Sequence, residues 1–188
     1  LGDPNPLHVQ ALNRASLPDR RKLFEIFNMC PGGTQALLDM RVALTRIRKQ
    51  NPQLDAVDSD LEILFHNWFN RGFLSLESID WKTPAFVLEK LIHYEAVHEI
   101  TGWDDLKRRV SSGRRCYAFF HPALPDEPII FVQVALVQGL VSNISDVIGE
   151  QIESPDESQA DTAIFYSISN CHPGLAGVSF GNFLIKNV

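Results

Sequence analysis

The sequence predicts an α+β protein in which an all-helical part precedes a part that mixes helices with strands. Up to residue 82 the apolar residues recur at helical spacing, whereas after Gly113 they form runs rich in β-branched and aromatic residues. The predicted strands follow one another and do not alternate with helices, which argues against a doubly wound parallel sheet. We therefore expect a helical domain over residues 1–82 and a second domain over residues 83–188.

Three helices are expected in the first domain, and they predict an all-α helical bundle. Ser16 and Thr34 are placed as N-caps of the first two, and Asp58 or Ser59 opens the third. The expected helices cover residues 16–30, 34–51 and 58–71. The aromatic residues of the third helix share one face, so we interpret them as core and not as a ligand site.

The second domain is expected to begin with two helices and to continue with three strands. Thr83 followed by Pro84 predicts a cap and a first helical position. The expected helices cover residues 83–98, 103–110 and 143–148, and the expected strands cover residues 115–121, 129–136 and 163–169. A proline-rich loop over residues 122–128 would join the first two strands into a hairpin, and the polar stretch 150–159 reads as a loop.

Composition and charge exclude several classes of protein. The chain has 188 residues and a net charge of −6, which argues against nucleic acid as a partner. No apolar run reaches the roughly 20 residues that span a bilayer, and the first residues lack a signal-peptide pattern, so we expect no membrane partner and a cytoplasmic location. The three cysteines have no metal-ligand spacing and are expected to be reduced thiols.

One dense basic cluster stands out in this acidic chain. It comprises residues 107–109 together with Arg114 and Arg115. The preferred interpretation is that these side chains are the solvated ends of a helix and a turn. A role in binding a small anionic ligand is the alternative.

The most informative segment is a glycine-bearing turn between the last predicted strand and a helix start. Strand, glycine turn and helix start together build an anion site, because the first N–H groups of a helix have no partner within it. The predicted phosphate-binding residues are Ala176, Gly177, Val178, Ser179, Phe180, Gly181 and Asn182. The glycine spacing fits neither a nucleotide P-loop nor a dinucleotide fingerprint. A hairpin, a strand and such a turn are how acyl-CoA acetyltransferase-type domains begin.

Several segments in order resemble malonyl-CoA decarboxylases, and the resemblance looks closer to bacterial members than to animal ones. The segments are residues 67–76, 95–98, 105–110, 114–117, 121–128, 163–169 and 174–186. The resemblance implies a helical domain followed by the first half of an acetyltransferase-type (GNAT-like) domain. It places the coenzyme A pyrophosphate at the turn, although Ala176 and Ser179 stand where the wider acetyltransferase signature has Arg or Gln and Gly.

The resemblance also implies a carboxy-lyase that converts malonyl-CoA to acetyl-CoA and carbon dioxide without a metal or organic cofactor. We also expect a homo-oligomer. The family's catalytic serine and histidine would lie beyond residue 188, so no catalytic residue is assigned in this chain. We therefore expect a fragment that is inactive alone.

Two other functions fit the same turn. One is an acyl-CoA-dependent acyltransferase, and the other is a non-catalytic module for acyl-CoA binding or oligomerisation. The histidines do not decide between them. His121 is interpreted as structural, His93 and His98 diverge on a helix and are not expected to share a metal, and His172 could touch a ligand.

Overall fold

The computed structural model describes residues 5–149, 157–180 and 183–188. Helices and an antiparallel sheet make up these residues, which confirms the α+β class. The backbone divides into two compact units, residues 1–67 and residues 68–188. The sequence pattern predicted the division at residue 82. In the structure, residues 75–79 pair with the sheet and therefore belong to the second unit.

The first unit is helical throughout its described part. Its helices are α1 (Pro6–Ser16), α2 (Asp19–Asn28), α3 (Gly33–Ile47) and most of α4 (Asp55–Trp68), with 3-10 turns at Arg48–Gln50 and Pro52–Leu54. Two predicted N-caps are wrong. Ser16 ends α1, where its hydroxyl donates to Asn13 O, and Thr34 lies inside α3 and donates to Asn28 Oδ1 at 2.6 Å.

A buried ion pair joins the third and fourth helices. Asp58 does not open α4, which begins three residues earlier. Its carboxylate lies 2.9 Å from Nε of Arg41 and 2.5 Å from Nη1 of Arg48. Because Arg41 and Asp58 are both almost fully buried, each neutralises a charge that would otherwise be costly in the interior.

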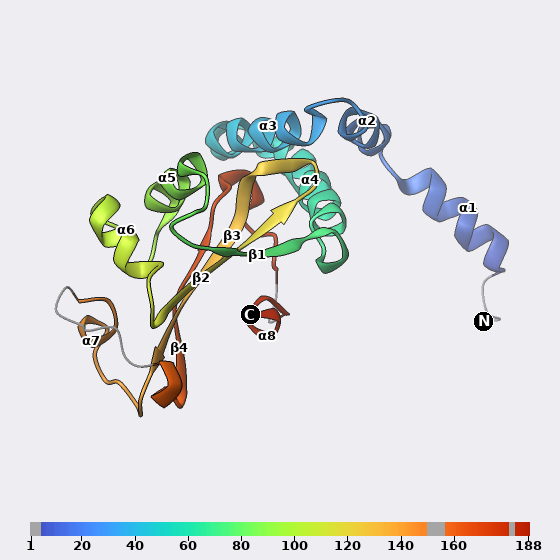
Figure 1. Ribbon diagram of the computed structural model, residues 1–188. Helices are drawn as coiled ribbons and strands as arrows, with labels where there is room; N and C mark the ends of the chain where they lie inside the picture. The colour runs from blue at the N-terminus through green and yellow to red at the C-terminus, as the bar shows by residue number, and fades with distance from the viewer. Residues whose placement is uncertain (1–4, 150–156, 181–182) are drawn as a thin grey trace. The chain divides into compact units, whose positions relative to one another are not determined.

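The second unit contains a four-stranded antiparallel sheet with the order β1-β2-β3-β4 (Figure 1). The strands are β1 (Ser75–Ile79), β2 (Arg114–His121), β3 (Leu124–Val137) and β4 (Thr162–Asn170). The sequence pattern did not predict β1. The other three strands match the predicted ones, and each is antiparallel to its neighbour.

The predicted proline-rich loop between β2 and β3 is wrong, because most of it belongs to β3. The turn consists of Pro122 and Ala123 alone, and His121 pairs with Leu124. Residues 125–127 leave the regular register as a bulge before Phe120 pairs with Pro128. A bulge accommodates proline, which cannot donate a ladder hydrogen bond, so the prolines remain within the strand.

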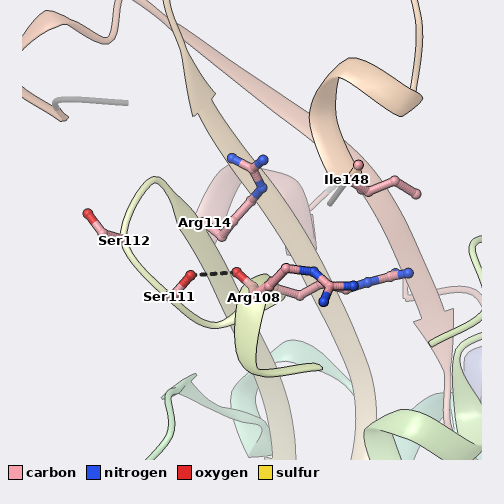
Figure 2. Close-up of a pocket in the computed structure, with 7 residues that line it drawn as sticks. Arg108, Ser111, Ser112, Arg114 and Ile148 are labelled. Carbon is pink, nitrogen blue, oxygen red and sulfur yellow. Dashed lines mark hydrogen bonds between the residues drawn. The ribbon is translucent and has the colours of Figure 1, made fainter. Parts of the chain in front are cut away.

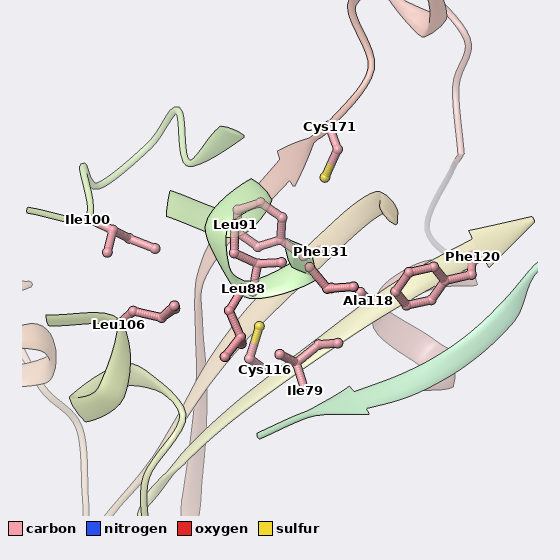
Figure 3. Close-up of a cluster of buried hydrophobic side chains, with 11 residues drawn as sticks. Ile79, Leu88, Leu91, Ile100, Leu106, Cys116, Ala118, Phe120, Phe131 and Cys171 are labelled. Carbon is pink, nitrogen blue, oxygen red and sulfur yellow. The ribbon is translucent and has the colours of Figure 1, made fainter. Parts of the chain in front are cut away.

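Two helices, α5 (Ala85–Tyr94) and α6 (Trp103–Arg109), cover one face of the sheet. The side chains between them form one apolar cluster, which Figure 3 shows. Its members are Ile79, Val87, Leu88, Leu91, Ile100, Leu106, Cys116, Ala118, Phe120, Phe131 and Cys171. Helix α5 ends four residues before the predicted end, and residues 95–98 turn back over the same sheet face.

The remaining elements are short. They are α7 (Ser145–Ile148), the 3-10 turns Arg71–Phe73, Glu157–Gln159 and Pro173–Leu175, and α8 (Phe183–Asn187). The predicted loop 150–159 lies mostly outside the described residues. Its last part is held in place, because the Glu157 carboxylate accepts from the Gly113 N–H and from Arg115.

Candidate functional site

The glycine-bearing turn begins where β4 ends and is tied to the sheet at its start. Cys171 N–H donates to Ile129 O of β3 at 2.9 Å. Nδ1 of His172 then accepts from Gly174 N–H at 3.1 Å, which caps the 3-10 turn Pro173–Leu175. One ring nitrogen of His172 therefore stabilises the turn, and the His172 side chain is buried.

The predicted phosphate-binding residues divide into anchors and exposed backbone. Val178 and Phe180 are buried and fix the turn, whereas Ala176, Gly177 and Ser179 are exposed. Ala176 N–H donates to Pro173 O and Val178 N–H donates to Leu175 O, so these two donors are already used. Gly181 and Asn182 lie outside the described residues.

Three N–H groups of the turn remain available to a ligand. Within the described part of the chain, the N–H groups of Gly177, Ser179 and Phe180 make no hydrogen bond. Gly177 has φ of 82°, in the left-handed region that favours glycine. Backbone N–H groups that no acceptor of the described chain uses can donate to an anion.

The strand that leads into this turn is an edge strand with a bulge. Strand β4 pairs with β3 on one side, and among the described residues no strand pairs with its other side. Gln133 pairs with Ser167 while Val134 pairs with Phe165, so Tyr166 is the extra residue of a β-bulge. Bulges increase local twist and re-aim side chains, and an unpaired edge offers backbone groups to an extended ligand.

A buried carboxylate lies beneath the bulge. Glu95, just after α5, accepts hydrogen bonds from the hydroxyl of Ser167 at 2.7 and 2.8 Å and from Nε2 of Gln133. It also accepts from the N–H groups of Val97 and His98 at 2.8 and 2.9 Å. The carboxylate therefore joins the turn at residues 95–98 to strands β3 and β4.

Tyr166 extends this network. Its hydroxyl donates to Gln133 Oε1 at 2.9 Å, so the bulge residue is connected through Gln133 to Glu95. Burial raises the pKa of Tyr166 well above its ordinary value. The phenol is therefore neutral at physiological pH and remains a hydrogen-bond donor.

Sequence reasoning assigned no role to Glu95, Gln133, Ser167 or Tyr166. The sequence did contain a signal for a buried polar network, because Gln133 and Ser167 interrupt apolar segments that are expected to be buried strands. Buried polar side chains are nearly always hydrogen-bonded, so they required a polar partner elsewhere in the chain. The strand register pairs Gln133 with Ser167, and the packing of residues 95–98 on the sheet supplies Glu95 as their partner.

His98 lies at the edge of this network, because its N–H donates to Glu95 and its ring lies near that of Tyr166, whereas His121 makes its hydrogen bonds elsewhere. Nε2 of His121 lies 3.0 Å from Trp68 O and its Nδ1 accepts from Ala123 N–H at 3.1 Å, so both ring nitrogens stabilise the hairpin end. Burial lowers the pKa of His121, which favours this neutral form. His93 lies edge-on to Tyr94, whereas His98 lies by Tyr166.

Fold and site together define an α+β protein whose edge strand leads into a candidate anion-binding turn. Among the described residues no helix is long and apolar enough to cross a membrane. Residues 3–69 match the malonyl-CoA decarboxylase N-terminal domain, and residues 72–188 match the malonyl-CoA decarboxylase C-terminal domain. The chain belongs to the malonyl-CoA decarboxylase family, which confirms the resemblance inferred from the sequence.

Two solved structures and two curated relatives illustrate the similarity. The malonyl-CoA decarboxylase of Agrobacterium vitis is 52% identical to this chain, with a TM-score of 0.92. That of Rhodopseudomonas palustris is 51% identical, with a TM-score of 0.89. Each comparison covers 98% of this chain and 45% of the solved chain. The mitochondrial malonyl-CoA decarboxylases of Anser anser anser and Mus musculus are 40% and 37% identical over 91% and 94% of this chain. The chain spans 35–37% of the length of these two curated relatives.

Proposed function

We propose that this chain is the coenzyme-binding part of an enzyme that decarboxylates malonyl-CoA to acetyl-CoA and carbon dioxide. The observation that carries the proposal is the turn after β4, which presents the N–H groups of Gly177, Ser179 and Phe180 without partners in the described chain. Family membership supplies the substrate class, since the matched relatives are malonyl-CoA decarboxylases.

The turn is proposed to bind the pyrophosphate of coenzyme A over residues Ala176 to Asn182. Backbone N–H groups are suitable donors because they carry partial positive charge and need no side-chain reorganisation. The exposed hydroxyl of Ser179 adds a fourth possible donor. Val178 and Phe180 are buried beneath the turn and hold its backbone in position.

The pantetheine arm is proposed to run along the open edge of β4. An extended chain of amides can hydrogen-bond to an unpaired strand edge, as an added strand does. The Tyr166 bulge interrupts regular pairing near the middle of β4, where the strand can diverge from its neighbour. These features support an acetyltransferase-type (GNAT-like) fold for the second unit.

The reaction needs an electron sink and a proton source. The bond between the malonyl C2 and its carboxylate carbon breaks, carbon dioxide leaves, and the electron pair passes into the thioester carbonyl to give an enolate. A proton then adds to C2 to give acetyl-CoA. A donor to the carbonyl oxygen stabilises the enolate, and we propose that the reaction uses no metal or organic cofactor.

Binding of coenzyme A to the purified chain tests the turn. Gly177→Val is expected to weaken the affinity measured by calorimetry by about tenfold or more, because a β-branched side chain is strained at positive φ and obstructs the close approach of phosphate. Gly139→Val is the matched control. Gly139 has φ of 72° and nothing lies within 4 Å of an added Cβ, so this variant carries similar backbone strain far from the turn.

The outcomes separate the possible functions. An equal loss of coenzyme A affinity in both variants would mean that backbone strain, and not the position of the substitution, causes the loss. The turn would then be excluded as the pyrophosphate site. Release of carbon dioxide from labelled malonyl-CoA by the natural full-length protein is expected. Transfer of the acyl group to an amine instead would identify an acyltransferase, and binding without any turnover would identify a non-catalytic module.

We also propose that the protein forms a homo-oligomer and acts in the cytoplasm. An apolar groove on the first unit supports the first statement, because exposed apolar surface is typical of protein interfaces. The groove is lined by Leu23, Phe24, Phe27, Ala36, Leu37 and Met40. Light scattering after size-exclusion chromatography measures the oligomeric state, and a monomer at micromolar concentration would contradict it.

A further inference from the structure

A small pocket lies between the C-terminal end of α6, the start of β2 and α7. Its lining residues are Arg108, Arg109, Ser111, Ser112, Arg114, Ile148 and Gly149. Figure 2 shows Arg108, Arg114 and Ile148 around one space, with Ser111 and Ser112 on the connecting loop. Three of the seven lining residues are arginines, and all three belong to the five-residue basic cluster of residues 107–109, Arg114 and Arg115.

The arginines of this pocket differ from the solvated side chains that the sequence favoured. Arg109 and Arg114 retain only 4% and 8% of their exposure, so the preferred interpretation is wrong for both. The Arg109 guanidinium uses four of its five donors, because it donates to both Asp105 oxygens and to the carbonyls of His98 and Glu99. It supplies positive charge to the pocket but few donors.

Arg114 is the exceptional member. Its one hydrogen bond within the described chain is a long contact of 3.4 Å from Nη1 to Gly113 O, and it forms no ion pair there. A guanidinium has five N–H donors and stays protonated in proteins, so most of the Arg114 donors have no acceptor among the described residues. Burial lowers the pKa of Arg114, which agrees with a charge that no carboxylate of the described chain compensates.

We propose that this pocket binds a small oxyanion, a phosphate or a carboxylate, through Arg114 with help from the charges of Arg108 and Arg109. A planar guanidinium matches such an anion with two parallel hydrogen bonds. The pocket volume is about 80 Å³, and one water needs roughly 10–15 Å³ on the same measure. The pocket therefore has room for one small oxyanion.

The pocket is separate from the coenzyme turn. Arg114 pairs with Ala135, which pairs with Ile164 near the start of β4, whereas the turn follows Asn170 at its end. Six residues of strand separate the two positions by about 20 Å. The oxyanion is therefore either a free ion or the carboxylate at the far end of an acyl-coenzyme thioester, and the second source rests on the proposed function.

Calorimetry and thermal melts with inorganic phosphate and with malonate test the proposal, at constant ionic strength maintained with chloride. Saturable binding and a rise in melting temperature are expected for the wild-type chain. Arg114→Met is expected to weaken binding by about tenfold to a hundredfold, since charge-assisted bonds are lost. Its melting temperature without anion is expected to equal or exceed that of the wild type, because an unpaired buried cation is removed.

Arg115→Met is the matched control, because Arg115 is the adjacent residue of β2, does not line the pocket and binds Glu157 instead. Its anion affinity is expected to stay within about twofold of the wild type. If Arg114→Met does not fold, Arg114→Lys replaces it; lysine keeps the charge without the planar fork and should also weaken binding. Absence of saturable binding to the wild type, or unchanged affinity in the Arg114 variant, would overturn the proposal.

The two sources of the anion give different results with coenzyme thioesters. If the site takes a free ion, Arg114→Met leaves the affinities for malonyl-CoA and acetyl-CoA in the wild-type ratio. If it takes the acyl carboxylate, the preference for malonyl-CoA falls in the variant while acetyl-CoA affinity is kept. If the chain binds phosphate but does not bind coenzyme A, the proposed function is rejected while the oxyanion site is retained.

Discussion

Replacement of Glu95 by alanine tests the buried network that connects α5 to the sheet. The carboxylate is 9% exposed and accepts from two backbone N–H groups, from the hydroxyls of Ser167 and Ser169 and from Gln133. Alanine would leave these donors without their acceptor. Each buried donor left unsatisfied costs about 1–3 kcal/mol, but neighbouring losses are not additive.

The expected loss is about 3–5 kcal/mol in the free energy of unfolding, because several donors lose their acceptor at about 1–3 kcal/mol each and the losses do not add fully. At about 2–4 °C per kcal/mol for a chain of this size, the melting temperature should fall by roughly 6–20 °C. Calorimetric or circular-dichroism melts measure this directly. Glu95→Gln keeps the shape and one acceptor oxygen, so its loss should be smaller.

Glu77→Ala is the control, because Glu77 is an exposed residue of β1 and is not one of the residues that bind Glu95. Its melting temperature should change by less than about 2 °C, as is usual for surface substitutions. If Glu95→Ala also melts within that range of the wild type, the carboxylate does not hold residues 95–98 to the sheet, and the reasoning is wrong.

Two further predictions concern titratable groups. Hydrogen bonds from Arg115, Gly113 and Ser112 lower the pKa of the Glu157 carboxyl from 4.5 to about 2, so its stabilisation is complete above the ordinary pKa and is lost as the pH falls towards 2. The difference in melting temperature between the wild type and Glu157→Gln should be constant at neutral pH and vanish near pH 2; a constant difference throughout would contradict the assignment. Burial raises the pKa of the Cys116 and Cys171 thiols, whereas Cys30 is exposed. A thiol reagent should therefore modify one cysteine in the native protein and all three only after denaturation, and rapid reaction of a second thiol would show that the core cluster opens.

The sequence predicted the elements whose pattern is local and missed those that depend on pairing. Helices α3, α4 and α6 and strands β2 and β4 show their period in the residues themselves. Strand β1 does not, because five residues with two apolar side chains become a strand only by pairing with β2. Helix α1 was missed for another reason, since Leu7 and Leu12 are exposed and give no buried face; the cap from Asn5 followed by Pro6 was the available signal.

For the candidate site, sequence located the turn but not the groups around it. A glycine-bearing segment between a strand and a helix is visible in the order of residues, and Gly177 indeed has positive φ. The partners of Glu95 lie 38 and 72 residues away, so only the sheet register and the packing of residues 95–98 on the sheet bring them together. The burial of Arg114 likewise follows from packing and not from composition, which is why solvated side chains were the preferred interpretation.

Backbone amide shifts during a coenzyme A titration test the central claim most directly. In ¹⁵N-labelled protein, the amides of Gly177, Ser179 and Phe180 are the donors that the turn leaves available to a pyrophosphate. We expect these amides to show the largest saturable shifts, and we expect the amide resonance of Gly139 to stay unchanged. Saturable shifts that leave all three turn amides unchanged would contradict it, because coenzyme A would then bind at another place on the chain.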